Sequence, residues 1–179
     1  MRRTVWSLAT ALAVATSALM LAALPAKAQA IDILALGASN TYGKGVSRNQ
    51  AYPRHLQNLL HTRGIKARVR NAGINGNTTG QMRARLPGAL RRSTRLVILQ
   101  PGGNDRRRGI SRTARSANIQ AMKRYLRGRG IAVVMLRNRL IGAVARRHTR
   151  PDGQHFLGSG YRALAARLLP RVLQAIPRR

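Results

Sequence analysis

The chain has 179 residues, 44% of them hydrophobic, which is enough for one domain with a packed core. Lysine and arginine number 34 against three aspartates and no glutamate, a formal net charge of +31. So few carboxylates exclude a carboxylate-rich metal cage and disfavour paired-carboxylate glycosidase chemistry. The absence of cysteine excludes disulfides, thiol nucleophiles and cysteine-bound metals, and the four scattered histidines form no zinc motif. We therefore expect no metal and no other cofactor.

Residues 1–28 have the pattern of an export signal. Arg2 and Arg3 precede an uncharged stretch, 4–25, and small-x-small sites then end at Ala28 and Ala30. The pattern predicts cleavage after Ala28 or Ala30 and a periplasmic or secreted domain over 29–179, with no membrane span left after cleavage. The uncharged stretch is also long enough to cross a bilayer, so an uncleaved anchor is the alternative.

The mature domain is expected to stay strongly basic. Cleavage after Ala28 removes three of the 34 basic residues (Arg2, Arg3 and Lys27), which leaves 31 against three acidic ones, or +28. A charge of this size predicts non-specific attraction to anionic surfaces. No zinc finger, basic zipper or aromatic-rich RNA motif accompanies it, so we expect no specific nucleic-acid partner.

After the signal, short apolar runs alternate with segments whose apolar residues recur at helical spacing. In chain order the pattern predicts a strand (31–37), a helix (50–63), a strand (66–73), a helix (78–91), a strand (95–102), a helix (111–127), a strand (131–137) and a last helix from Ser159. Pro87 and Pro170 are expected to end or bend their helices.

This alternation predicts an α/β domain with a parallel sheet and helices on both faces. Ligands of such sheets bind beyond the carboxyl ends of the strands, near the point where the strand order reverses. Polar, glycine-bearing loops follow each predicted strand and contain Ser39, Gly76, Asn104 and the pair Asp152 and His155. Each loop taken alone has a plainer explanation, such as a helix cap at Ser39, but together they predict one site.

The blocks around these residues resemble the SGNH or GDSL hydrolases, a family of serine esterases, lipases, thioesterases and carbohydrate deacetylases. The resemblance rests on ILALGASNTYGKGV, NAGINGNTTG, PGGND and DGQHFLGSGY. It implies a flavodoxin-like three-layer sandwich and hydrolysis of carboxylic esters or thioesters. It also implies Ser39 as nucleophile, His155 as its general base and Asp152 as the group that orients the imidazole. The oxyanion hole would comprise the N–H groups of Ser39 and Gly76 and the side-chain amide of Asn104.

Elementary chemistry requires the same residue types. A serine hydroxyl is a poor nucleophile until a neighbouring imidazole removes its proton, and a carboxylate three residues before a histidine can hold the ring in the right tautomer. A developing oxyanion requires preorganised donors, and glycine leaves its N–H unobstructed.

Three features depart from the family pattern. Ala38 stands where members usually have aspartate, so a local hydrogen bond that stiffens the nucleophile turn is expected to be missing. Asn77 stands where many members have aspartate, and there we expect only a modest local effect. Only 13 residues, 139–151, separate Asn138 from Asp152, where many relatives have a further helix and a fifth strand. Residues 140–145 fit a short strand or a helical turn, so the sheet is expected to have four to five strands. The short connection predicts an open, shallow site for small acyl groups.

Two further interpretations remain open at this point. Arg106, Arg107 and Arg108 directly follow the PGGND block, so they could attract substrates that bear phosphate or carboxylate, or simply form a solvated loop. The whole chain could also be a non-catalytic, cationic envelope-binding protein on a degenerate hydrolase scaffold.

Overall fold

The structure is a computed structural model that describes residues 30–153 and 155–177. The predicted export signal, residues 1–28, lies outside these residues. A parallel sheet forms the centre of the molecule in the order β2-β1-β3-β4. Its strands are β1 (Ile31–Gly37), β2 (Ala67–Gly73), β3 (Thr94–Gln100) and β4 (Ala132–Met135). All four predicted strands are confirmed, each within two residues at either end.

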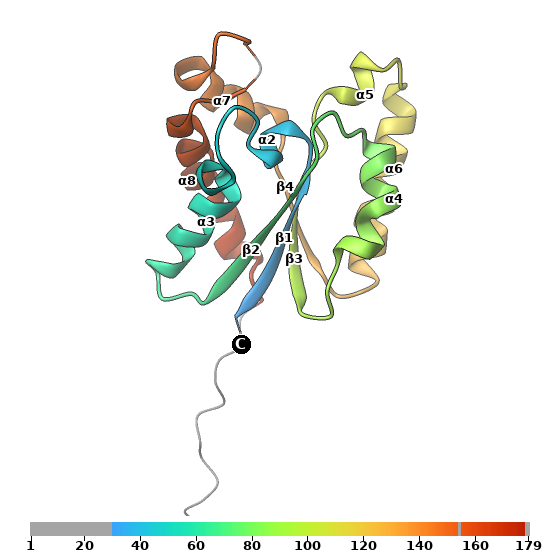
Figure 1. Ribbon diagram of the computed structural model, residues 1–179. Helices are drawn as coiled ribbons and strands as arrows, with labels where there is room; N and C mark the ends of the chain where they lie inside the picture. Colours follow the sequence, from blue (N-terminus) through green and yellow to red (C-terminus); the bar gives the residue numbers. More distant parts are fainter. Residues whose placement is uncertain (1–29, 154, 178–179) are drawn as a thin grey trace, which may run out of the picture.

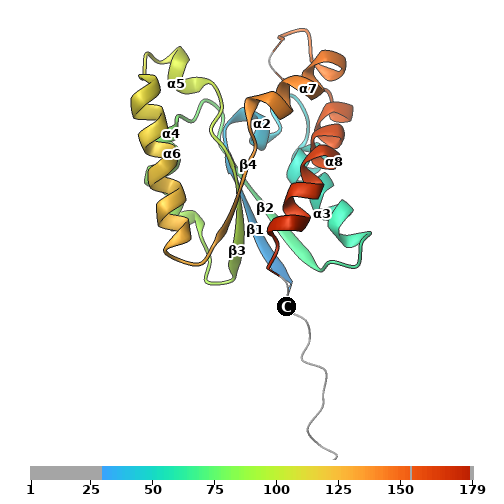
Figure 2. The same cartoon turned by 180° about the vertical axis from the view of Figure 1, so that it is seen from behind.

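Helices cover both faces of the sheet, as the alternation predicted (Figures 1 and 2). One face carries α3 (Tyr52–His61), α7 (Asn138–His148) and α8 (Gly158–Ala175), and the other carries α4 (Thr79–Ala89) and α6 (Arg112–Arg127). The short helices α2 (Ser39–Tyr42) and α5 (Asn104–Arg107) follow β1 and β3, and a 3₁₀ turn spans Arg48–Gln50. The three-layer α/β sandwich is therefore confirmed.

The central strands are mostly apolar because both of their faces are covered. Along β1, Ile33 and Ala35 pack under α3 and α8, whereas Leu34 and Leu36 pack under α4 and α6, and all four are fully buried. Successive side chains of a strand point to opposite faces, so the middle of a strand between two helical layers is hydrophobic on both faces.

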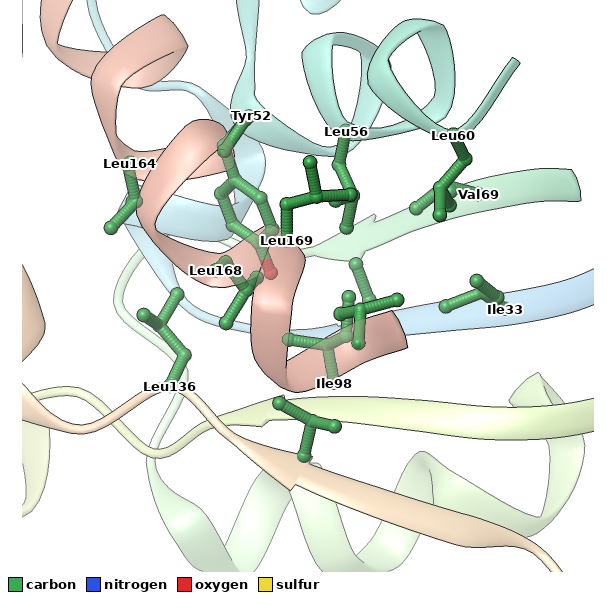
Figure 3. Packing of buried hydrophobic residues seen from close by; sticks show 14 of the residues in the cluster. Ile33, Tyr52, Leu56, Leu60, Val69, Ile98, Leu136, Leu164, Leu168 and Leu169 are labelled. Carbon is green, nitrogen blue, oxygen red and sulfur yellow. The ribbon is translucent and has the colours of Figure 1, made fainter. Parts of the chain in front are cut away.

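The larger core lies between the sheet and the α3–α8 layer (Figure 3). Tyr52, Leu56 and Leu60 recur every four residues on α3 and meet Leu164 and Leu168 of α8, and all five are fully buried. Pro53 occupies the first turn of α3, where proline removes no helical hydrogen bond. Pro87 stands in the last turn of α4, and α8 continues past Pro170 to Ala175.

The ambiguous segment after β4 is a helix. Leu140, Ile141 and Val144 have helical spacing in α7 and join the core beside α8. The chain then forms a single antiparallel bridge between Thr149 and Phe156, and the described sheet has four strands. No helix in the part of the chain that the structure describes is long and apolar enough to cross a bilayer.

One of the three aspartates supports the amino end of the sheet. Asp32 is 4% exposed and accepts hydrogen bonds from Arg70 Nε at 2.9 Å and from Thr94 Oγ1 at 2.7 Å. Burial of the carboxyl acts to raise its pKa, but the hydrogen bonds from Arg70 and Thr94 and the charge of Arg70 outweigh it. The pKa of Asp32 therefore lies below its usual value of 3.8.

Candidate active site

The strand order reverses between β1 and β3, and the candidate site lies at that point. The chain leaves β1 toward β2 and leaves β3 toward β4, so the loops after these central strands diverge and leave a crevice at their carboxyl ends. A cavity of about 200 Å³ lies there. Its lining comes from residues 38–40 after β1, from 100, 102–104 and 107 at and beyond the end of β3, from Asn138 and Ile141 of α7, and from His155.

Ser39 is the first residue of α2, directly after β1. The turn before it is fixed by Gln100, the last residue of β3, whose side-chain oxygen accepts hydrogen bonds from the Ala38 N–H at 3.0 Å and the Thr41 hydroxyl at 3.2 Å. Ala38, Thr41 and Gln100 are all at most 2% exposed. The Ala38 side chain contributes no hydrogen bond of its own, and Gln100 of the neighbouring strand holds the turn through the Ala38 N–H and the Thr41 hydroxyl.

Close packing at this turn also requires glycine before Ala38. A Cβ atom on Gly37 would lie 2.1 Å from Thr41 Oγ1 and 2.8 Å from Gln100 Oε1, well inside contact distance. The absence of a side chain at Gly37 therefore lets β1 approach the hydroxyl and amide that hold the Ser39 turn.

Asp152 and His155 form a hydrogen-bonded pair in the loop between α7 and α8. The Asp152 carboxylate lies 2.7 Å from His155 Nδ1 and also accepts a hydrogen bond from the His155 backbone N–H at 2.9 Å. His155 is 7% exposed, whereas the Asp152 side chain is 43% exposed. A carboxylate on Nδ1 fixes the proton there and leaves Nε2 as the basic nitrogen of the neutral ring. His155 and Ser39 line the same cavity, and no direct hydrogen bond joins these two described residues.

The Asn104 amide is held on both sides at the start of α5. Its Nδ2 donates to the Asn77 carbonyl at 2.8 Å, and its Oδ1 accepts from the Arg107 guanidinium at 2.7 Å. Because an amide nitrogen carries two hydrogens, the second N–H of Asn104 can still donate to a ligand in the cavity. Gly76 has a φ of 73° in the turn after β2 and lies outside the cavity lining, so the structure does not place it with the other predicted site residues there.

The loop that contains Gly76 is tied to β1 by Arg85 of α4. Arg85 Nε donates to Asn77 Oδ1 at 2.7 Å, and a terminal nitrogen of the same guanidinium donates to the Gly37 carbonyl at 3.1 Å. Burial lowers the pKa of Arg85 from its usual value. The partly buried Arg85 guanidinium thus joins Gly37, two residues before Ser39, to Asn77. The Asn77 carbonyl in turn holds the Asn104 side chain.

The third aspartate is structural at this edge of the sheet. Asp105 is fully buried, and its carboxylate accepts hydrogen bonds from the backbone N–H of Thr79 at 3.2 Å and from the Thr79 hydroxyl at 2.5 Å. It therefore anchors the start of α5, and Asn104 with it, to the start of α4. In the described ranges, histidine, aspartate and glutamate form no group of three that could hold a metal ion.

The three arginines after the PGGND block occupy different surroundings. Arg107 lines the cavity and bonds to Asn104, whereas the Arg108 guanidinium lies 3.4 Å from the position that a Cβ on Gly76 would occupy. Arg106 is exposed and is not part of the lining. Of the three, the structure brings Arg107 to the site.

Comparison with known proteins identifies the family. Residues 35–175 match the GDSL-like Lipase/Acylhydrolase family. The chain belongs to this family. Esterase TesA of Pseudomonas aeruginosa PAO1 is 34% identical over 119 residues, which are 66% of this chain and 59% of TesA. The thioesterase 1/protease 1/lysophospholipase L1 of Escherichia coli K12 is 30% identical over 132 residues, 73% of this chain and 62% of that protein. The match thus spans about three fifths of these relatives.

The fold of a solved structure matches the fold of this chain over a longer stretch than the sequence matches do. AlinE4, an SGNH-hydrolase family esterase, superposes with a TM-score of 0.62 at 25% identity, covering 84% of this chain and 98% of AlinE4. This GDSL-like chain therefore has the α/β fold of SGNH hydrolases, as the sequence blocks implied.

Sequence reasoning missed four residues that build the site of this GDSL-like protein. Gln100 and Arg85 act through hydrogen bonds to segments far away in sequence, so no local pattern marks them. Asn138 and Ile141 line the cavity from the first turn of α7. Their spacing of three residues places them on one helical face, a signal that becomes usable once 138–148 is known to be a helix.

Proposed function

We propose that this chain is an exported serine esterase that hydrolyses carboxylic esters or thioesters of small acyl groups with Ser39, His155 and Asp152. The observation that carries the proposal is that Ser39, Asn104 and His155, from three distant segments, line one cavity at the strand-order switch point. His155 is held there by the Asp152 carboxylate. Family membership and relatives that are named as an esterase and a thioesterase support the same chemistry.

In the first half of the proposed reaction, Ser39 Oγ attacks the acyl carbon while His155 Nε2 takes the hydroxyl proton. Asp152 stabilises the resulting imidazolium. The tetrahedral oxyanion accepts hydrogen bonds from the Ser39 N–H and from Asn104 Nδ2, with the Gly76 N–H as the third proposed donor. The carbon–oxygen or carbon–sulfur bond then breaks, and His155 returns the proton to the departing alcohol or thiol.

In the second half, water attacks the acyl-serine ester and gives its proton to His155. The carboxylic acid leaves, and the proton returns to Ser39 Oγ. Each step uses groups already present in the chain and consumes one ester bond and one water, so no cofactor takes part.

The cavity favours small acyl groups. Its volume of about 200 Å³ is below the roughly 300–1,000 Å³ typical of pockets that enclose drug-sized ligands. Ile141 is the one large apolar side chain in a lining that is otherwise mostly polar or glycine. A long alkyl chain would therefore extend out of the cavity over exposed surface and gain little affinity there.

A panel of p-nitrophenyl esters with acyl chains from two to twelve carbons tests the proposal. We expect the highest kcat/KM at two to four carbons and a loss of activity in Ser39→Ala and His155→Ala, with Asp152→Asn equally or less affected. No hydrolysis of any ester or thioester by the folded protein would refute the esterase and favour the cationic envelope-binding alternative.

Export forms part of the proposal and rests on the pattern of residues 1–28. Mass spectrometry of the protein recovered from the periplasm or medium of an expressing bacterium should show a new N-terminus at Gln29 or Ile31. Full-length protein retained in the membrane fraction would instead support the uncleaved anchor.

A further inference from the structure

A second hollow, on the side of α7 away from the candidate active site, is lined by arginines. It has a volume of about 480 Å³ and lies between α7, α8 and the end of β4. Its lining residues are Arg137, Arg139, Leu140, Ala143, Arg146, Arg167 and Arg171. We call this feature the arginine hollow. None of its side chains lines the cavity that holds Ser39 and His155.

The positions of these arginines follow from the helical repeat. On α7, Asn138 and Ile141 point to the candidate active site, whereas Arg139, Ala143 and Arg146 are spaced by four and three residues and share another face. Arg167 and Arg171 are four residues apart on α8, which packs beside α7 (Figures 1 and 2). Two helices thus direct cationic side chains into one space.

Among the described residues, no carboxylate neutralises the charge of the arginine hollow. All five arginines are exposed, and none of their side chains forms a hydrogen bond or an ion pair with another described residue. The carboxylates of the described chain are used elsewhere: Asp32 pairs with Arg70, Asp105 bonds to Thr79, and Asp152 bonds to His155. Like charges gathered in one concave space repel one another, so this arrangement costs stability unless an anion occupies it.

We propose that the arginine hollow binds an anion that carries two or more phosphate groups. Guanidinium groups present planar pairs of donors that match phosphate oxygens, and several of them around one space suit a multivalent anion better than a single carboxylate. Leu140 and Ala143 add an apolar part to the lining, which can contact a carbon portion of the ligand. A free oligophosphate and the head groups of an anionic lipid share this chemistry.

Titration calorimetry with inorganic tripolyphosphate at about 0.15 M salt tests the site, because the Debye length there is only about 8 Å and distant charges are screened. We expect saturable 1:1 binding by the wild type. The variant R146Q/R167Q/R171Q should bind at least about 30-fold more weakly, since a charge-assisted hydrogen bond is worth roughly tenfold in affinity. It should keep the circular dichroism spectrum and cooperative melting of the wild type.

A charge-matched control separates a built site from general basicity. Arg92, Arg112 and Arg124 are exposed, lie outside the hollow and form no side-chain hydrogen bond with a described residue. The variant R92Q/R112Q/R124Q loses the same three charges and should lose less than about threefold in affinity. Equal losses in the two variants, or no saturable binding by the wild type, would overturn the proposal.

Two further readouts complete the test. Tripolyphosphate should raise the melting temperature of the wild type and of the control but not of R146Q/R167Q/R171Q, because a ligand stabilises only the state that binds it. Vesicles of phosphatidylglycerol identify the natural source of the phosphates. If vesicle binding is lost only in the hollow variant, the source is a lipid head group. If all three proteins bind vesicles equally while tripolyphosphate still distinguishes them, the source is a free oligophosphate.

Discussion

Replacing Gln100 with methionine tests how the turn before Ser39 is held in place. Methionine preserves the length and approximate volume of the side chain but removes the oxygen that accepts hydrogen bonds from Ala38 and Thr41. We expect the free energy of unfolding to fall by about 2–4 kcal/mol, because a buried donor left without a partner costs roughly 1–3 kcal/mol.

The magnitude follows from what each donor can do after the change. Ala38 is 2% exposed, and Gln100 is the one described acceptor of its N–H, so this donor bears the full penalty. The Thr41 hydroxyl is fully buried but lies 3.5 Å from the Tyr52 hydroxyl, which can take up part of its hydrogen bonding. Because the loosened turn carries Ser39, we also expect kcat for a short-chain ester to fall about 10- to 100-fold.

Thr41→Val is the matched control. It removes the bond to Gln100 together with its donor and leaves Gln100 bonded to Ala38, but it also removes the long 3.5 Å contact with the Tyr52 hydroxyl, so we expect a loss of about 1–2 kcal/mol. Urea unfolding gives both free energies, and initial rates with p-nitrophenyl acetate give kcat. A Gln100→Met variant no less stable than Thr41→Val, with unchanged kcat, would refute this account of the turn.

Three further predictions concern charged residues. Arg85→Met should lower kcat about tenfold with little change in KM for a neutral ester, because the guanidinium holds the loop of Gly76, the proposed oxyanion donor, and does not line the cavity. A change in KM alone would contradict this. Because the folded-state pKa of Asp32 lies below 3.8, its ion pair contributes stability that is present above pH 3.8 and is lost as the pH falls through the folded-state pKa. Arg70→Met should cost about 3–5 kcal/mol at neutral pH, and in urea unfolding at pH 2–6 it should abolish this acid-dependent loss. Arg107→Gln should raise KM for an anionic ester and remove the salt dependence of that KM, while a neutral ester of the same acyl length shows no salt dependence in either protein. Equal salt dependence of both esters in the wild type would show that Arg107 does not attract anionic substrates.

The strands could be predicted because a strand that is buried on both faces is a run of consecutive apolar residues. Residues 31–37 are apolar almost throughout, and both faces of β1 are covered. The pair of Asp152 and His155 could be predicted because its signal is also local. The two residues are three positions apart in one loop, which is close enough to bring the carboxylate to the imidazole.

The support of the Ser39 turn could not be predicted from local pattern. Gln100 stands 62 residues from Ala38, and only the pairing of β1 with β3 brings them together. Segment 140–145 was ambiguous because a short apolar run fits both a strand and a helix. The choice is made by packing of Leu140, Ile141 and Val144 beside α8, which is tertiary information.

The central claim is that Ser39 is an activated nucleophile, and active-site labelling tests it most directly. The wild-type protein is treated with a fluorophosphonate, digested and analysed by mass spectrometry, beside His155→Ala and Ser39→Ala variants. A fluorophosphonate reacts with a serine only when a neighbouring base takes the hydroxyl proton. We predict one stoichiometric adduct on Ser39 in the wild type, at least about 100-fold slower labelling in His155→Ala, and none in Ser39→Ala. An adduct on a different serine, or labelling of Ser39 at the same rate without His155, would contradict the account.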